Sequence, residues 1–240
     1  MFSPVIGVYT GIRPGAFSLS VNLRGPRDHK IGLVENLIMT FAGYRELSWL
    51  TREALTECDS FDCAYHKIRD TPISALGYVI LAGTEGDEGV VVTRNRLSVA
   101  HENHLNATAG KWYVVQTNND HWDSGCFNRC AAATDHMESV GQENISPAAL
   151  RHDVEEQFPN LNYITIYNSQ LVPSAGYIDT VAEKYEGEQP EAEKKYKWHE
   201  GLPRDPIDES LFEGLDDFTM DDLIGGVQML IEEAVAHFEG

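Results

Sequence analysis

The segment WYVVQTNNDHW, from Trp112 to Trp122, joins a short apolar run to a dense polar group. The apolar run Trp112–Val115 is typical of a strand, and it stops abruptly at Gln116-Thr117-Asn118-Asn119-Asp120-His121. Strand ends that present amides, a carboxylate and an imidazole together are common places for binding and catalytic sites. The same pattern is typical of an edge strand that leaves the core through a polar turn. Both interpretations apply to this segment.

Strand and helix patterns alternate along the rest of the chain. Strand patterns cover Val5–Thr10 and Phe17–Asn22 around a Gly11–Gly15 turn, then Leu76–Ala82, Gly89–Thr93, a short stretch near Val99, Lys111–Gln116 and Tyr163–Tyr167. Helix patterns cover Ile31–Phe41, Leu47–Leu55, a segment capped by Asp59 or Ser60 that runs to about Arg69, and a segment from Ser146-Pro147 to about Gln157. These patterns alone predict a mixed α and β protein.

Composition limits the function classes. With 240 residues, 42% hydrophobic and 10% aromatic, the chain is long enough and apolar enough for a packed core. A formal net charge of −20 argues against nucleic acid as a partner, because phosphate binding requires clustered Lys and Arg. No apolar run approaches the roughly 20 residues of a membrane span, so no transmembrane segment is expected.

The composition changes near the C-terminus. From Glu183 to Gly240 there are 17 acidic and 5 basic residues, so −12 of the net charge falls there. Lys184–Pro206 has the polar, proline-containing composition of a linker. Thr219 precedes an amphipathic helical pattern that ends at Phe238. We therefore predict a folded domain over residues 1–182 and an acidic linker with one amphipathic helix over residues 183–240.

Five blocks of the chain resemble, in the same order, the acid ceramidases and the N-acylethanolamine-hydrolysing acid amidases. The blocks are VYTGIRPGAFSLSVNLR (Val8–Arg24), SWLTREALTECDSFDCA (Ser48–Ala64), GYVILAGTEGDEGVVVTRNR (Gly77–Arg96), QTNNDHW (Gln116–Trp122) and GQENIS (Gly141–Ser146). The family consists of cysteine amidases of the N-terminal-nucleophile class. The resemblance covers most of the chain from Val8 to about Tyr185.

This resemblance implies a fold, an activity and a location. The fold would be α+β, as part of a four-layer αββα N-terminal-nucleophile hydrolase sandwich. The activity would be hydrolysis of a lipid amide, a ceramide or an N-acylethanolamine, to a fatty acid and an amine, with no cofactor. The location would be the lysosome or secretory lumen, with a signal peptide upstream of this chain.

The family nucleophile has no counterpart in this sequence. In the family, the mature β-chain begins with the catalytic cysteine, whose own α-amino group is the general base. This chain begins Met1-Phe2-Ser3-Pro4, and none of its four cysteines aligns with the nucleophile. We expect the chain to be inactive alone. One interpretation is the C-terminal portion of a β-chain that needs an upstream α-chain or β-chain segment; the alternative is a non-catalytic homologue that acts as a binding or assembly module.

The resemblance carries two catalytic residues onto this sequence. Asn118 matches the family asparagine whose side-chain amide helps hold the oxyanion of the tetrahedral intermediate. Arg129 matches the first arginine of the family's Asp-Asp-Arg-Arg segment, but both acids and the second arginine are absent here. The glutamate of the family's Asn-Glu-Arg segment is Leu23 in this chain.

Aromatic side chains beside Asn118 are candidates for substrate binding. Trp112, Tyr113 and Trp122 would line a groove for the acyl chain, although aromatics in this pattern are also typical of a core. His121 titrates in the range useful for acid–base chemistry. We expect a structural or supporting role for His121, because the family mechanism takes its base from the N-terminal amine.

Two triplets fit the glycosylation signal, at Asn106-Ala107-Thr108 and Asn144-Ile145-Ser146. The resembled family also carries a signal within the block that contains Asn144. Glycosylation of Asn106 and Asn144 would place the chain in the secretory lumen.

The four cysteines are Cys58, Cys63, Cys126 and Cys130. Two local disulfides are one arrangement, although three connectivities are allowed, and four free buried thiols are equally compatible with the sequence. A zinc site is the poorest interpretation, because the Cys126-x3-Cys130 pair lacks a matching second pair and the spacing of His101-Glu102-Asn103-His104 is unlike the helical His-Glu-x-x-His motif. No metal is expected.

Overall fold

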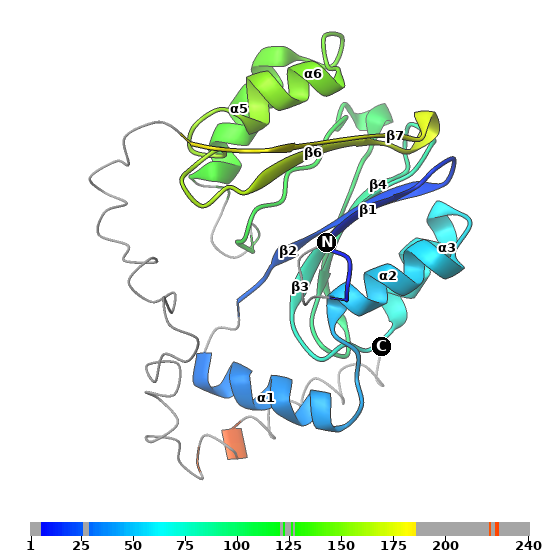
Figure 1. The fold of residues 1–240 in the computed structure, drawn as a ribbon, viewed down its shortest axis with the longest axis vertical. Helices are drawn as coiled ribbons and strands as arrows, with labels where there is room; N and C mark the ends of the chain where they lie inside the picture. The colour runs from blue at the N-terminus through cyan, green and yellow to red at the C-terminus, as the bar shows by residue number, and fades with distance from the viewer. Residues whose placement is uncertain are drawn as a thin grey trace.

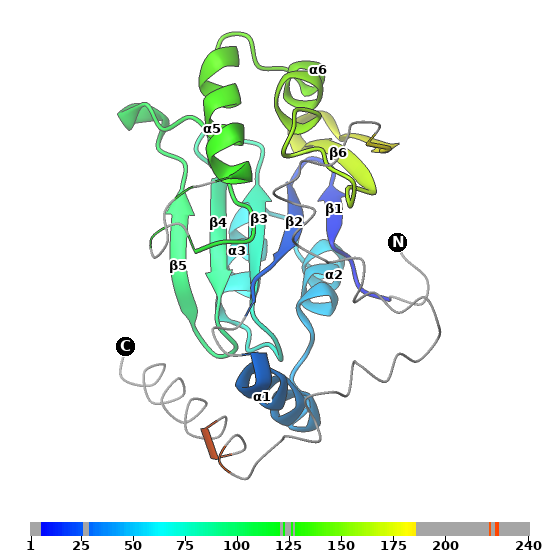
Figure 2. The ribbon, with the colours of Figure 1, turned by 90° about the vertical axis from the view of Figure 1, so that its left-hand side faces the viewer.

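The larger sheet of the molecule has five antiparallel strands in the order β1-β2-β3-β4-β5. The computed structural model describes residues 6–25, 29–120, 122, 126, 128–185, 221 and 224–225. Figure 2 shows the five strands side by side. They are β1 (Thr10–Arg13), β2 (Phe17–Leu23), β3 (Gly77–Ala82), β4 (Gly89–Arg94) and β5 (Val99–His104).

Two helices cover one face of this sheet, α2 (Leu47–Glu57) and α3 (Phe61–Asp70). Strand alternation sends every second side chain toward them. The register aligns apolar residues of neighbouring strands in two rows, which are Leu19, Leu81 and Val90 in one row and Val21, Val79 and Val92 in the other. These rows pack with Leu50, Ala54, Ala64 and Ile68 of the helices in the main hydrophobic core.

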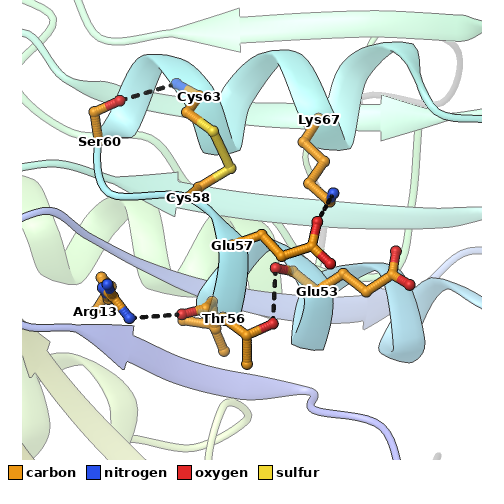
Figure 3. Close-up of a disulfide and its surroundings, with 9 residues drawn as sticks. Arg13, Glu53, Thr56, Glu57, Cys58, Ser60, Cys63 and Lys67 are labelled. Atoms are coloured by element: carbon orange, nitrogen blue, oxygen red, sulfur yellow. Dashed lines mark hydrogen bonds and ion pairs between the residues drawn. A yellow bond between two sulfur atoms is a disulfide. The ribbon is translucent and has the colours of Figure 1, made fainter.

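A disulfide between Cys58 and Cys63 crosses the turn from α2 to α3, as Figure 3 shows. The Oγ of Ser60 accepts a hydrogen bond from the Cys63 backbone N–H at 3.3 Å, so Ser60 is the N-cap that the sequence offered as one of two choices. Lys67 pairs with Glu57 at 2.6 Å across the same turn. The turn is therefore fixed by a covalent bond, a cap and an ion pair.

Helix α1 (His29–Phe41) lies at one end of the larger sheet (Figure 2). Arg96, just after β4, pairs with Glu35 of α1 at 2.9 Å, and the two side chains are only 4% and 3% exposed. Arg96 also donates to the side-chain oxygen of Asn36 at 2.7 Å. A buried charge requires such partners, so this group ties α1 to the sheet.

A second sheet, β6 (Tyr167–Val172) paired with β7 (Tyr177–Ala182), lies beside the first. Two helices cover its outer side, α5 (Arg129–Val140) and α6 (Pro147–Ala149). Helix α6 continues directly into a π-type turn, η2 (Leu150–Glu155). Figure 1 shows the resulting order: helices, small sheet, larger sheet, helices. The fold is thus a mixed α and β structure, as expected, and the strand pairs of both sheets are antiparallel.

The two sheets meet where β1 approaches β6. The hydroxyl groups of Thr10 and Tyr167 are 3.0 Å apart. A short helix, η3 (Pro173–Ala175), lies between β6 and β7. The Gly15 N–H donates to its Pro173 carbonyl at 2.9 Å. Gly176 has φ +61°, a left-handed conformation that favours glycine, and this lets the chain turn into β7.

Three strand predictions were wrong. The first strand is Thr10–Arg13 rather than Val5–Thr10, because the Val8 N–H binds the Ser48 carbonyl of α2 instead of a neighbouring strand. Lys111–Gln116 forms no strand beyond an isolated bridge from Lys111 to Asn106. Tyr163–Tyr167 is mostly a turn, since Asn162 accepts from Ile164 N–H through its side chain, and the strand begins only at Tyr167.

The remaining predictions have mixed outcomes. Helices α1, α2 and α3, strands β3 to β5 and the Ser146 cap of α6 match their predicted positions. Helix α5 and strand β7 were not predicted. The acidic linker and amphipathic helix over residues 183–240 lie almost entirely outside the described residues and stay predictions. Among the described residues, no helix is long and apolar enough to cross a membrane.

Candidate functional site

The segment Gln116–Asp120 lies against the face of the larger sheet that faces away from α2 and α3. The strand register places Asn22, Tyr78, Thr93 and His101 opposite one another across β2 to β5 on that face. The Asn22 side-chain N–H donates to the carbonyls of Gln116 at 2.8 Å and Thr117 at 3.4 Å. The polar segment Gln116–Asp120 thus packs against a row of polar residues on this face of the sheet.

Asn118 is oriented by two contacts. Its Nδ2 donates to the Leu23 carbonyl at 2.8 Å, and its Oδ1 accepts from Arg129 Nη2 at 2.5 Å. A carbonyl can only accept and a guanidinium can only donate, so these partners fix which end of the carboxamide is which. Asn118 is exposed as a residue, and Leu23 is the acceptor that its Nδ2 binds among the described residues.

Arg129 is the first residue of α5, and it reaches Asn118 directly. A disulfide between Cys126 and Cys130 encloses Arg129, with three residues between the two cysteines. Asn128, just before it, adopts a positive φ of 50°. The disulfide and the start of the helix therefore set the position from which the guanidinium approaches Asn118.

The carboxylate of Asp120 binds two residues of the larger sheet. Arg24 donates from Nε at 2.8 Å and from Nη2 at 2.7 Å, a bidentate ion pair. The Tyr78 hydroxyl donates to the same carboxylate at 2.6 Å. Asp120 belongs to the polar segment that the sequence pointed to, whereas Arg24 and Tyr78 were not predicted as site residues. The alternation of Asn22 and Arg24 at the end of β2 is the sequence signal that could have pointed to Arg24.

Two pKa shifts follow from this contact. Burial and the bond to Asp120 raise the pKa of Tyr78 well above its usual value, so the phenol stays protonated and donates. Burial of Arg24 opposes its charge, but the hydrogen bond and charge of Asp120 outweigh this and raise the pKa of Arg24. The raised pKa values keep Arg24 charged and Tyr78 protonated, so both side chains remain donors.

The three candidate aromatic residues lie in two surroundings. Trp112 and Tyr113 pack against the second hydrophobic core, formed by Ala133, Met137 and Val154, and the Tyr113 hydroxyl donates to Glu138 at 2.6 Å. Burial and this bond raise the pKa of Tyr113 to about 12. Trp122 instead stacks on His101 with ring centroids 4.4 Å apart. An acyl groove lined by all three side chains stays a prediction.

Leu23 stands at the end of β2 and is 72% exposed. Its carbonyl oxygen, not its side chain, contacts Asn118. His121, the other residue considered for acid–base chemistry, lies outside the described residues.

Both glycosylation candidates are exposed. Asn106 caps the short helix η1 (Ala107–Ala109), with its oxygen accepting from Ala109 N–H at 3.0 Å. Asn144 donates to the Val140 carbonyl at 3.0 Å. Their positions are compatible with a glycan, and glycosylation itself stays a prediction.

All four cysteines of the 240-residue sequence form disulfides, Cys58 with Cys63 and Cys126 with Cys130. The local pairing is thus the arrangement found among those the sequence allowed. The residues 1–240 consequently offer no thiol nucleophile. The described residues also hold no cluster of His, Cys, Asp and Glu suited to a metal ion. What the site offers chemically is a fixed amide donor beside a guanidinium, an arrangement that can polarise a carbonyl oxygen.

Comparison with known proteins identifies relatives but no matching family model. The chain is 34% identical to the acid ceramidase of Homo sapiens over 185 residues, which is 75% of this chain and 46% of that protein. It is 36% identical to the N-acylethanolamine-hydrolyzing acid amidase of Cavia porcellus over 173 residues, 71% of this chain and 48% of the relative. The chain thus spans about half the length of the relatives it matches.

A solved structure matches the fold. It is the Caenorhabditis elegans orthologue of N-acylethanolamine-hydrolyzing acid amidase, with a TM-score of 0.66 and 29% sequence identity. The match covers 72% of this chain and 73% of that one. Fold and sequence therefore point to the same group of proteins.

Proposed function

We propose that this chain, a homologue of the acid ceramidases and the N-acylethanolamine-hydrolysing acid amidases, forms the oxyanion-binding part of a lipid amidase. The substrate would be a ceramide or an N-acylethanolamine, whose amide bond is hydrolysed with one water to a fatty acid and an amine. The observation that carries the proposal is the carboxamide of Asn118, an exposed residue, oriented by its contacts with Leu23 and Arg129. Such a donor stabilises the developing oxyanion without having to ionise.

The nucleophile would come from a polypeptide segment outside these 240 residues. The family resemblance implies an N-terminal cysteine, whose thiolate attacks the amide carbon while its amine takes the proton. Every cysteine within the 240 residues is disulfide-bonded, which supports an outside source for the thiol. Two disulfides and two exposed glycosylation signals support a lysosomal or secretory location.

Fatty-acid release near pH 5 and at pH 7 tests this proposal. The 240-residue protein should release no fatty acid from ceramide or N-acylethanolamine. The same protein fused behind a segment that begins with cysteine should release it, and a thiol reagent should abolish the release. Turnover by the 240-residue protein alone would contradict the proposal.

A non-catalytic binding or assembly module is the second candidate. It is supported by Leu23, which replaces a glutamate of the family, and by the pairing of all four cysteines. A fused protein that binds ceramide but never hydrolyses it would favour this candidate over the enzyme.

A further inference from the structure

The Asp120 carboxylate is held more firmly than an ordinary surface acid. Three donor atoms of Arg24 and Tyr78 bind it, at 2.6 to 2.8 Å. The Arg24 and Asp120 side chains are only 13% and 20% exposed. A bidentate arginine–carboxylate pair fixes direction as well as distance, because both groups are planar and forked.

Arg24 is itself anchored on its other side. Its Nη1 donates to the Asn95 side-chain oxygen at 2.8 Å and to the Arg94 carbonyl at 3.3 Å. The guanidinium also lies 6.0 Å from the centre of the Trp122 ring. The clamp, meaning Arg24, Tyr78 and Asp120, therefore connects the ends of β2 and β4 with the candidate segment.

The candidate segment depends on side chains for its path. Residues 116–120 belong to no strand, so no ladder of backbone hydrogen bonds sets their course. Asn22 holds the segment at Gln116 and Thr117, and the clamp holds it at Asp120. Asn118 lies between these two fixed points.

Stability alone explains the clamp poorly. A buried ion pair contributes little net free energy, because desolvation of the two charges offsets their attraction. Apolar side chains of similar volume would stabilise the same contact at least as well. What only a forked, charged contact provides here is a defined direction for the end of the segment.

We propose that Asp120, held by Arg24 and Tyr78, is a positioning residue that fixes the segment so that Asn118 meets Arg129 and Leu23. The proposal rests on the proposed oxyanion role of Asn118 only for its catalytic consequence. The structural claim stands by itself.

Nuclear magnetic resonance of the asparagine-labelled 240-residue protein tests the structural claim, with the Asn118 side-chain signal identified by its loss in Asn118→Ala. In Asp120→Asn, the Asn118 amide should move to the position of a solvent-exposed asparagine and exchange with water about tenfold faster. Tyr78→Phe should shift the Asn118 amide signal in the same direction but by a smaller amount. Asp179→Asn, which breaks a 2.7 Å ion pair with Arg151 elsewhere, is the matched control and should leave it unchanged.

An unmoved Asn118 amide in folded Asp120→Asn would overturn the proposal. If Asp120→Asn does not fold, Tyr78→Phe decides the question, because it removes a single hydroxyl. An unmoved amide in folded Tyr78→Phe would then overturn it.

Kinetics of the protein fused to a cysteine-bearing segment separate this proposal from the proposed function. Asp120→Asn should lower kcat about 10²-fold at nearly constant KM, and should add little to the loss caused by Asn118→Ala. If the amide moves but kcat does not, positioning stands and the oxyanion role fails. If kcat falls while the amide stays in place, positioning is overturned.

Discussion

At the scale of single residues, Asn118 and Arg129 form one unit. Arg129 donates to the oxygen of the carboxamide, and this leaves the nitrogen to donate to the Leu23 carbonyl. Arg129 would therefore act through Asn118. The Cys126–Cys130 disulfide spans the position of Arg129 in the sequence.

Arg129→Ala should lower kcat of the fused protein about tenfold, since the carboxamide loses one of its two orienting bonds. In the Asn118→Ala background the same change should cost almost nothing further. The measurement is a double-mutant cycle on fatty-acid release. Full additivity of the two losses would contradict the shared role.

The site could be predicted only in part from the sequence. Asn118 and Arg129 came from the family resemblance, and their contact could not be read from a spacing of 11 residues. The Arg24–Asp120 pair joins residues 96 apart, so only the assembled sheet brings them together. Contacts of this range depend on strand order and register, which local patterns do not determine.

At the scale of elements, the C-terminal end of α3 contacts a buried arginine of the larger sheet. Arg94 is fully buried, and its guanidinium donates to the carbonyls of Ile68 and Arg69, and to that of Thr71 at 2.9 Å. The last carbonyls of a helix lack partners within the helix, and they carry partial negative charge. Arg94 supplies both the donors and the opposite charge.

Arg94→Met should therefore lower the free energy of unfolding by about 3–5 kcal/mol, because several buried carbonyls lose their donors. Arg52→Met is the control, since Arg52 is exposed and donates to the Ile6 carbonyl at 2.7 Å. Its effect should stay within about 0.5 kcal/mol. Chemical denaturation of both variants measures the difference, and equal losses would refute the assigned role.

The contact of η2 with β6 should depend on pH. Burial raises the pKa of Glu155, and hydrogen bonds from Asn168 and Gln170 only partly oppose this. A carboxyl whose pKa is higher in the folded state binds its proton more tightly there. Its contribution to stability is complete below its ordinary pKa and is lost as pH rises through the raised value.

We therefore expect the wild-type protein to lose stability, relative to Glu155→Gln, as pH rises from about 4 to 7. Denaturation of both proteins at several pH values gives the difference. A difference that grows in the opposite direction, or does not vary, would contradict the assignment to Glu155.

Elements with local signals were predicted well, and elements that depend on distant partners were not. Ser60 and Ser146 cap helices at their predicted positions, because a cap is a contact within three residues. Lys111–Gln116 has the composition of a strand. Its backbone is instead bound by the Asn22 side chain at the Gln116 carbonyl, and its apolar side chains pack against the second hydrophobic core. Strand propensity is overridden where no partner strand is present.

At the scale of the whole molecule, the two sheets differ in how well they are covered. The larger sheet is buried against α2 and α3, whereas β7 is mostly exposed. Ile178 on β7 is 52% exposed, and Ile166 before β6 is 64% exposed. A two-stranded sheet is marginal alone, and exposed apolar edges favour association.

The 240-residue protein should therefore form oligomers or require a partner chain for solubility. Size-exclusion chromatography with light scattering measures this. Ile178→Lys with Ile166→Lys should shift the population toward monomer, while Leu37→Lys, an exposed position on α1, should not. A monodisperse wild-type monomer would contradict the expectation.

The most direct test of the central claim is the turnover of Asn118→Ala in the protein fused to a cysteine-bearing segment, measured as fatty-acid release near pH 5. If Asn118 is the oxyanion donor of a lipid amidase, kcat should fall by about 10²–10³-fold while KM stays nearly constant, because the donor acts on the transition state. Full turnover by Asn118→Ala would contradict the claim.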